Sequence, residues 1–138
     1  MSYDLMVFAS ESAPKERAKF LEWFEAQAEW SEDHSYDTPD VSTPQLRAWF
    51  MEMIESFPAL NGPHSMAELP KDESLPTDYC VGRHVIYAAF RWSKAEAAYE
   101  RVFALAAKHA VGFFDVSSDH AEVWLPDGKG DLALSSSE

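Results

Sequence analysis

The chain has 138 residues, a formal net charge of −13 and a hydrophobic share of 46%. This composition fits one folded domain with a hydrophobic core and excludes a disordered chain. Asp and Glu outnumber Lys and Arg by 24 to 11, so we expect no nucleic-acid partner, because attraction to phosphates requires the opposite charge.

The first expected element is a strand over residues 3–9, which is rich in apolar side chains. Ser12 and Pro14 then indicate the start of a helix over residues 14–30. At about 100° per residue, its apolar side chains form one stripe and its acidic side chains gather on another face. The stripe consists of Phe20, Leu21, Phe24 and Ala28, and the acidic face of Glu22, Glu25, Glu29 and Asp33.

A second helix is predicted after a polar loop over residues 31–42. Thr43 and Pro44 form an N-cap and first-turn pair, and Pro58 ends the helix near residue 57. Its buried stripe is predicted to contain Leu46, Trp49, Phe50, Met53, Ile54 and Phe57. The next stretch, residues 61–77, is rich in proline and is predicted to be a long surface loop.

Two strands and a third helix follow this loop. The strands are expected over residues 78–81 and 84–92, and the second is apolar on both faces, as a central strand is. Ser93 and Glu96 have the spacing of a capping box, which predicts a helix from there to about residue 109. Gly112 is available for the turn that leaves this helix.

The last expected elements are two short strands, over residues 113–116 and 122–125, which form a hairpin. The predicted order is therefore β-α-α-β-β-α-β-β. That order indicates an α+β fold with a mostly antiparallel sheet and helices packed on one face, a ferredoxin-like variant. We expect a single domain over residues 1–126 and a frayed tail over residues 127–138.

Signals for export or membrane insertion are missing from the sequence. The N-terminal residues form neither a basic nor an apolar stretch, as a secretory signal would. No apolar run approaches the roughly 20 residues of a membrane-spanning helix. The single cysteine, Cys80, cannot form a disulfide within the chain and fits a reducing compartment. We therefore expect a cytoplasmic protein with no membrane partner.

The segment between Phe20 and Pro70 carries ten carboxylates but only one Lys or Arg, Arg47. Large aromatic side chains interrupt it, which is typical of a surface that binds a basic protein. The predicted partner-binding residues are Glu22, Glu25, Glu29, Glu32, Asp33, Asp37 and Asp40, with Trp23, Trp30 and Tyr36 as anchors. The alternative is a solvated helix face that serves solubility alone, although such a face usually mixes both signs of charge.

Motifs for catalysis or metal binding are not found. Glu32, Asp33, His34 and Asp37 offer oxygen and imidazole donors, but their spacing matches neither a structural zinc site nor an EF-hand, so we predict no metal. The sequence has no nucleophile elbow, phosphate-binding glycine loop or dinucleotide fingerprint. We predict no cofactor and do not favour an enzyme, and we expect Cys80 to be a small buried hydrophobe.

Four segments resemble a group of small bacterial proteins that are similar to the immunity proteins of polymorphic-toxin and type VI effector systems. They are residues 2–8, 13–24, 79–93 and 108–117, read as SYDLMVF, APKERAKFLEWF, YCVGRHVIYAAFRWS and KHAVGFFDVS. The resemblance implies a cytoplasmic, non-catalytic inhibitor that binds a toxin domain and blocks its active site. A nuclease toxin tends to be basic, which an acidic inhibitor would match.

Two other functions stay open at this point. The chain could be a small-molecule-binding or catalytic domain with a pocket between sheet and helices, near Asp78, Tyr79, His84 and Tyr87. It could also form a homodimer through Trp23 and Trp30.

Overall fold

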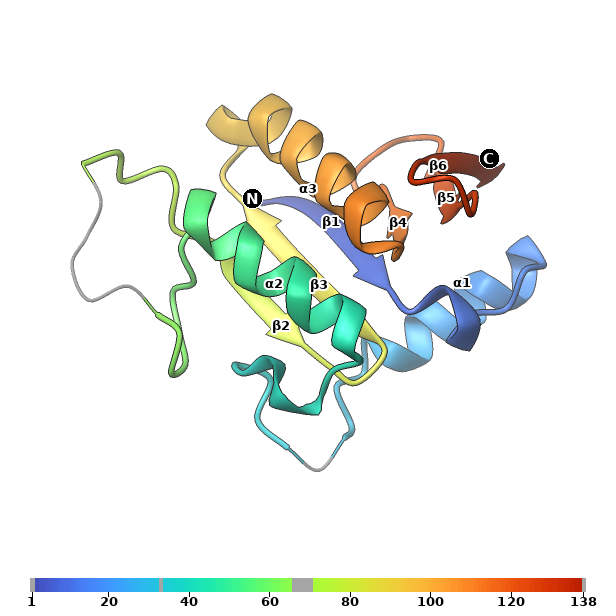
Figure 1. Ribbon diagram of the computed structural model, residues 1–138, viewed down its shortest axis with the longest axis horizontal. Coiled ribbons are helices and arrows are strands. Elements are labelled where there is room, and N and C mark those ends of the chain that lie inside the picture. Colours follow the sequence, from blue (N-terminus) through green and yellow to red (C-terminus); the bar gives the residue numbers. More distant parts are fainter. Residues whose placement is uncertain (1, 33, 66–70, 138) are drawn as a thin grey trace.

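The computed structural model describes residues 2–32, 34–65 and 71–137 (Figure 1). Six strands form one sheet in the order β2-β3-β1-β4-β5-β6, and every neighbouring pair is antiparallel. The strands are β1 (Tyr3–Phe8), β2 (Asp78–Val81), β3 (Val85–Phe90), β4 (Gly112–Phe114), β5 (Val123–Pro126) and β6 (Leu132–Ser136). The α-helices are α1 (Arg17–Gln27), α2 (Pro44–Ser56) and α3 (Ala95–His109). None of the helices in these residues is long and apolar enough to cross a membrane.

The strand order confirms the predicted α+β fold. β1 lies between β3 and β4, the chain reaches β2 by way of α2, and it reaches β4 by way of α3. This is the split βαβ arrangement of ferredoxin-like folds, extended on one side by β5 and β6. β1 is central because its consecutive residues Leu5, Met6, Val7 and Phe8 are all buried, which requires cover on both faces of the sheet.

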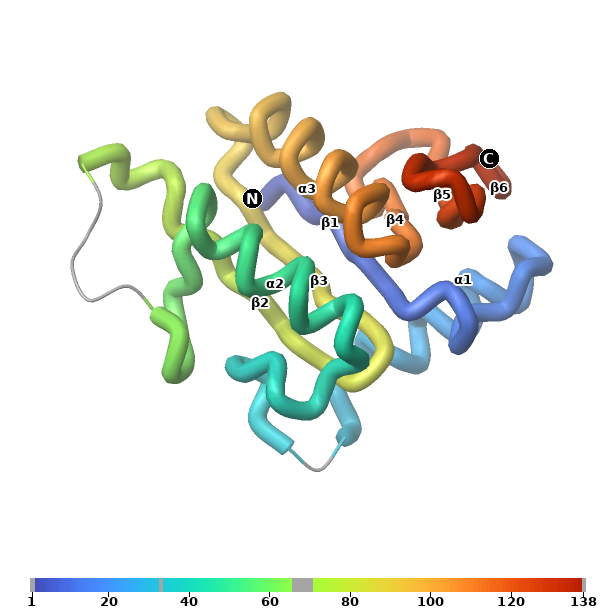
Figure 2. The backbone as a smooth tube through the Cα atoms, in the orientation of Figure 1, coloured from blue at the N-terminus to red at the C-terminus, as the bar shows by residue number. Residues whose placement is uncertain are grey.

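One face of the sheet, which carries Leu5 and Val7, is covered by α2 and α3 (Figure 2). Thr43 caps α2 as predicted, because its hydroxyl oxygen accepts a hydrogen bond from the Leu46 N–H, at 3.4 Å. The buried side chains of the two helices are Leu46, Trp49, Phe50 and Met53 on α2, and Ala98, Val102, Leu105 and Ala106 on α3. Each large side chain among these stabilises the fold by roughly 1.5–3 kcal/mol relative to the same side chain at an exposed position.

The opposite face, which carries Met6 and Phe8, is covered in part by α1. The ring of Phe20 lies 5.1 Å from that of Phe8 and 5.2 Å from that of Phe114, measured between centroids. The prediction had all helices on one face, and the structure differs from it in this helix. The physical reason lies in β1, because an inner strand that is apolar on both sides needs a second layer.

α1 is also shorter than the predicted helix over residues 14–30. It begins at Arg17, after a 3₁₀ turn over Ser10–Ser12, and ends at Gln27. Trp30 has a φ of 49°, which is left-handed backbone and cannot continue a helix. This turn of the chain directs Trp30 back toward the sheet, where its ring lies 6.3 Å from that of Tyr87.

The predicted capping box at the start of α3 is not formed. Ser93 lies within a 3₁₀ turn over Trp92–Lys94, and Lys94 occupies the N-cap position without a side-chain hydrogen bond. At the other end, Ala110 and not Gly112 adopts the left-handed conformation, with a φ of 56°. Gly112 has a packing role instead, because a Cβ atom there would lie 2.2 Å from Cζ of Phe8.

The predicted frayed tail is wrong over residues 132–136, which form β6 and pair with β5. Hydrogen bonds and two glycines stabilise the turn between β5 and β6. The side chain of Asp127 accepts hydrogen bonds from the N–H groups of Lys129 and Asp131, at 2.7 and 3.2 Å. Gly128 and Gly130 supply the positive φ angles that the turn requires.

Candidate functional site

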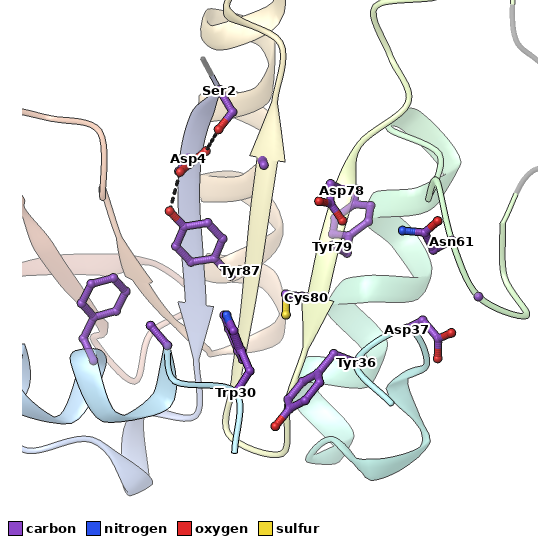
Figure 3. A pocket seen from close by; sticks show the side chains of 14 residues that line it. Ser2, Asp4, Trp30, Tyr36, Asp37, Asn61, Asp78, Tyr79, Cys80 and Tyr87 are labelled. Carbon is purple, nitrogen blue, oxygen red and sulfur yellow. Dashed lines mark hydrogen bonds between the residues drawn. The ribbon is translucent and has the colours of Figure 1, made fainter. Parts of the chain in front are cut away.

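A cleft with a volume of about 930 Å³ opens on the same sheet face that α1 covers in part, beside the end of that helix (Figure 3). Its floor is formed by side chains that alternate along the strands: Asp4 of β1, Tyr87 and Ala89 of β3, and Asp78 and Cys80 of β2. Its walls are the end of α1, with Phe24 and Ala28, the following loop, with Trp30, Tyr36 and Asp37, and the pair Asn61 and Gly62.

Asp4 is held in place on the floor of this cleft. The Tyr87 hydroxyl donates a hydrogen bond to Oδ2 of Asp4, and the Ser2 hydroxyl donates one to Oδ1, at 2.5 Å (Figure 3). Burial raises the pKa of Tyr87 above its ordinary value, and the hydrogen bond to Asp4 and the charge of that carboxylate raise it further. Tyr87 therefore stays protonated at neutral pH and remains the donor in this hydrogen bond.

The aromatic wall of the cleft is built by the loop after α1. The ring of Trp30 meets that of Tyr36 edge to face, with centroids 5.3 Å apart. The Glu32 N–H donates to the Tyr36 hydroxyl, at 2.6 Å, which holds the end of this ring. The carbonyl of Tyr36 accepts from the Val81 N–H at 2.9 Å, so the loop is fastened to the edge of β2.

Glu32 and His34 have a structural role in the same loop. Oε1 of Glu32 lies 2.5 Å from Nε2 of His34 and accepts a hydrogen bond from the Arg83 N–H at 3.2 Å. The pKa of His34 is raised, first by the hydrogen bond of its ring to the carbonyl of Ser35 and then by Glu32. When His34 is protonated, it forms an ion pair with Glu32 within the loop.

The second wall depends on close contact between two loops. Gly62 has a φ of +88° and lies against Asp37, so that a Cβ atom at Gly62 would be only 2.1 Å from the carbonyl oxygen of Asp37. Only glycine fits there without movement of the backbone. The contact sets the position of Asp37 at the edge of the cleft.

The predicted partner-binding residues divide into four groups. Trp30, Tyr36 and Asp37 line the cleft. Glu22 and Glu25 are exposed on α1, and Glu29 is exposed in the turn that follows it. Asp40 is also exposed, with Oδ1 3.9 Å from Nη2 of Arg47. Glu32 belongs to the loop structure above, and Asp33 lies outside the described residues. Trp23 is half-buried and packs against Phe8 and Phe20, at 5.9 and 5.8 Å between centroids.

The predicted pocket residues are only partly brought together. Asp78 and Tyr87 line the cleft. Tyr79 borders it, but its ring packs in the core on the other side of the sheet, where its hydroxyl donates to the carbonyl of Phe57 at 2.7 Å. His84 does not line the cleft, since its Nδ1 lies 3.1 Å from Oγ of Ser12 instead.

The cleft contains one thiol, that of Cys80. Burial, with the nearby charge of Asp78, raises the pKa of Cys80 to about 11, so the thiol is protonated at neutral pH and is a poor nucleophile. Within residues 2–32, 34–65 and 71–137, no three potential metal ligands lie together. Carboxylates and aromatic rings are the groups that the cleft offers.

Two acidic residues were missed by the sequence reasoning. Asp4 interrupts the apolar strand at the sheet face that later proves to be open, and this break in the pattern was a signal for it. Asp115, which follows β4, is only 6% exposed, and among the described residues its Oδ1 atom has no hydrogen-bond partner. Burial and then the charge of Glu122 raise the pKa of Asp115 to about 6.

Comparison with protein-family models, with the curated proteins and with the solved structures finds no match for this chain. The likeness to immunity proteins therefore stays a prediction.

Proposed function

We propose that this chain is a non-catalytic binding protein that recognises a basic protein domain and blocks it, as an immunity-type inhibitor blocks its toxin. The observation that carries the proposal is the junction between the cleft and the acidic side of α1. Phe24 of α1 and its C-cap residue Ala28 border the cleft, and Glu25 and Glu29 follow them directly in the chain. The acidic side of α1 consists of Glu22 and Glu25 on the helix and Glu29 just after it. A cationic partner would meet both in one surface.

The charge of this surface is not neutralised within the protein. Glu22, Glu25 and Glu29 are exposed, and in the described part of the chain none of their side chains forms an ion pair or a hydrogen bond. Like charges at spacings of three and four residues on a helix destabilise it slightly. Such an arrangement steers a basic partner toward the surface and raises its association rate.

The aromatic residues give the surface a means of anchoring a partner. Trp30 and Tyr36 are half-buried, their rings contact each other, and both border an open cleft. Interface hot spots favour tryptophan and tyrosine that lie next to charged groups and are enclosed on binding. The charges would set the rate of encounter, and these rings would set how long the complex lasts.

The proposal is tested by capture of partners from a lysate of the source organism with three tagged forms of the protein. They are the wild type, Glu25→Lys/Glu29→Lys on the acidic side of α1, and Glu96→Lys/Glu100→Lys on α3. The second pair is the matched control, because its residues are also exposed and four apart and their substitution changes the net charge equally. We expect one stoichiometric basic protein on the wild type and on the control, and its loss from Glu25→Lys/Glu29→Lys. Equal capture by both variants, or no basic protein on the wild type at low salt, would refute the proposal.

A second candidate, a small-molecule-binding domain, is favoured by the size of the cleft. A volume of about 930 Å³ is within the range of ligand pockets, and polar groups of Asp4, Asp78 and Tyr87 point toward it (Figure 3). A free metabolite bound by the purified protein, with no protein captured, would favour this function over the first.

A further inference from the structure

We propose that the cleft is a socket for one organic cation, the guanidinium or ammonium group of an arginine or lysine side chain that the basic partner inserts. This inference rests on the proposed function and specifies what the partner must carry.

The charged side chains that line the cleft are all acidic. Asp4, Asp37 and Asp78 all border the cleft, and none of its lining residues is Lys, Arg or His. Asp37 and Asp78 form no ion pair among the described residues, whereas Asp4 is occupied by the hydroxyls of Tyr87 and Ser2. Two carboxylates thus remain free to accept hydrogen bonds from a cation that enters, and the third adds to the field.

Two aromatic rings lie across the cleft from two of its carboxylates. Figure 3 shows Asp37 and Asp78 on one side of Cys80, and Trp30 and Tyr87 on the other side. A cation between them would have carboxylates on one side and aromatic rings on the other. Planar guanidinium groups are suited to both, because they pair with carboxylates and stack on rings. A neutral ligand of the same shape would lack the charge–charge attraction and would donate weaker hydrogen bonds to the carboxylates.

The apolar lining and the size of the cleft fit a side chain that a protein segment carries. The apolar part of the lining, Phe24, Ala28 and Ala89, would contact the alkyl stem of an arginine or lysine while its charged end meets the carboxylates. A volume of about 930 Å³ is larger than one side chain needs. It therefore leaves room for the backbone segment of the partner that carries the side chain.

The test is an NMR titration of the purified, ¹⁵N-labelled protein with n-butylguanidinium, and with N-butylurea as the neutral molecule of the same shape. The indole N–H signals of the five tryptophans report on the site. Trp30 borders the cleft, whereas Trp49 is fully buried in the core on the other side of the sheet and is the internal reference. We expect a saturable shift of the Trp30 signal with n-butylguanidinium, no shift with N-butylurea, and no change at Trp49.

Two variants with the same change in net charge locate the binding. Asp78→Asn removes a carboxylate that borders the cleft, and Glu96→Gln removes one on α3, which lies on the other face of the sheet. Both residues are exposed, so neither substitution disturbs the core. We expect Asp78→Asn to raise the dissociation constant for n-butylguanidinium about five-fold, the effect of one partly exposed ion pair, and Glu96→Gln to leave it nearly unchanged. No shift at Trp30, an equal response to N-butylurea, or an equal effect of the two variants would overturn the inference.

A last titration separates the two possible sources of the cation. Nα-acetyl-arginine N-methylamide imitates an arginine within a protein, and agmatine imitates a free metabolite. Binding of the blocked arginine at least as tightly as agmatine supports insertion by a partner protein, and binding of agmatine alone contradicts it. If n-butylguanidinium fails to bind while Glu25→Lys/Glu29→Lys still loses the captured protein, the socket is wrong and the proposed function survives.

Discussion

Asp115→Asn should make the protein more stable at neutral pH. The carboxyl group of Asp115 is nearly enclosed, its Oδ1 atom has no hydrogen-bond partner among the described residues, and the charge of Glu122 acts against its ionisation. Its backbone N–H donates to the carbonyl of Glu122 at 3.0 Å, a hydrogen bond that the substitution keeps. Asparagine has nearly the same shape and carries no charge.

The magnitude follows from the difference in pKa between the folded and unfolded chains. The pKa of Asp115 is about 6 in the folded protein and 3.8 as the ordinary value. Between these values the folded state holds a proton that the unfolded state has released, so the free energy of unfolding falls as pH rises. Above pH 6 the free energy of unfolding is lower by the full amount, about 3 kcal/mol. Below pH 4 both states hold the proton and the loss vanishes.

The assay is urea unfolding at a series of pH values from 3.5 to 8, with the wild type, Asp115→Asn, and Asp119→Asn as a control. Asp119 is exposed, lies four residues away and loses the same charge on substitution. The difference in free energy of unfolding between Asp115→Asn and the wild type should grow from near zero at the acid end to about 3 kcal/mol above pH 7, and Asp119→Asn should show no such trend. A constant difference across the whole range would show that burial does not raise this pKa.

Two further pairs of substitutions test the backbone. Gly62→Ala should cost more stability than Gly128→Ala and should abolish the n-butylguanidinium response of Trp30, because both glycines have positive φ angles but only Gly62 has an atom of Asp37 within 4 Å of the added Cβ. Equal unfolding midpoints in urea would disprove the close contact. Ala110→Gly should raise the free energy of unfolding by about 0.5–1 kcal/mol, because glycine adopts the left-handed conformation of that residue without strain. Ala104→Gly, at an exposed position inside α3, should lower it by about 1 kcal/mol, and a loss in both variants would contradict the assignment of Ala110.

Much of the fold could be predicted because local signals and tertiary packing agree. Thr43 and Pro44 predicted the start of α2, and the structure forms that cap. Where local signals compete with packing, prediction failed. Ser93 and Glu96 have the spacing of a capping box, yet the chain forms a 3₁₀ turn over Trp92–Lys94 and Lys94 takes the N-cap position. The four consecutive apolar residues at 5–8 indicate that both faces of the sheet need cover. Which helix covers the second face depends on contacts between residues that are distant in the sequence.

The candidate site could also be predicted only in part. Trp30, Tyr36 and Asp37 were predicted as one surface, and Asp78 and Tyr87 as another. Their meeting in one cleft follows from the pairing of β2 with β3 and from the hydrogen bond between the Val81 N–H and the carbonyl of Tyr36. About forty residues separate the two segments, and sequence periodicity carries no information at that distance. The contact between Trp23 on α1 and Phe8 of the central strand likewise depends on packing between segments that are distant in the sequence.

The central claim, that the acidic side of α1 and the cleft bind a basic protein, is tested most directly by the association rate of the captured partner as a function of salt. The rate is measured by stopped flow for the wild type, Glu25→Lys/Glu29→Lys and Glu96→Lys/Glu100→Lys. We predict a rate that falls steeply with salt for the wild type and the α3 control, and a slower rate with a shallower dependence for the α1 variant. The same rate and the same salt dependence for all three proteins would contradict the account.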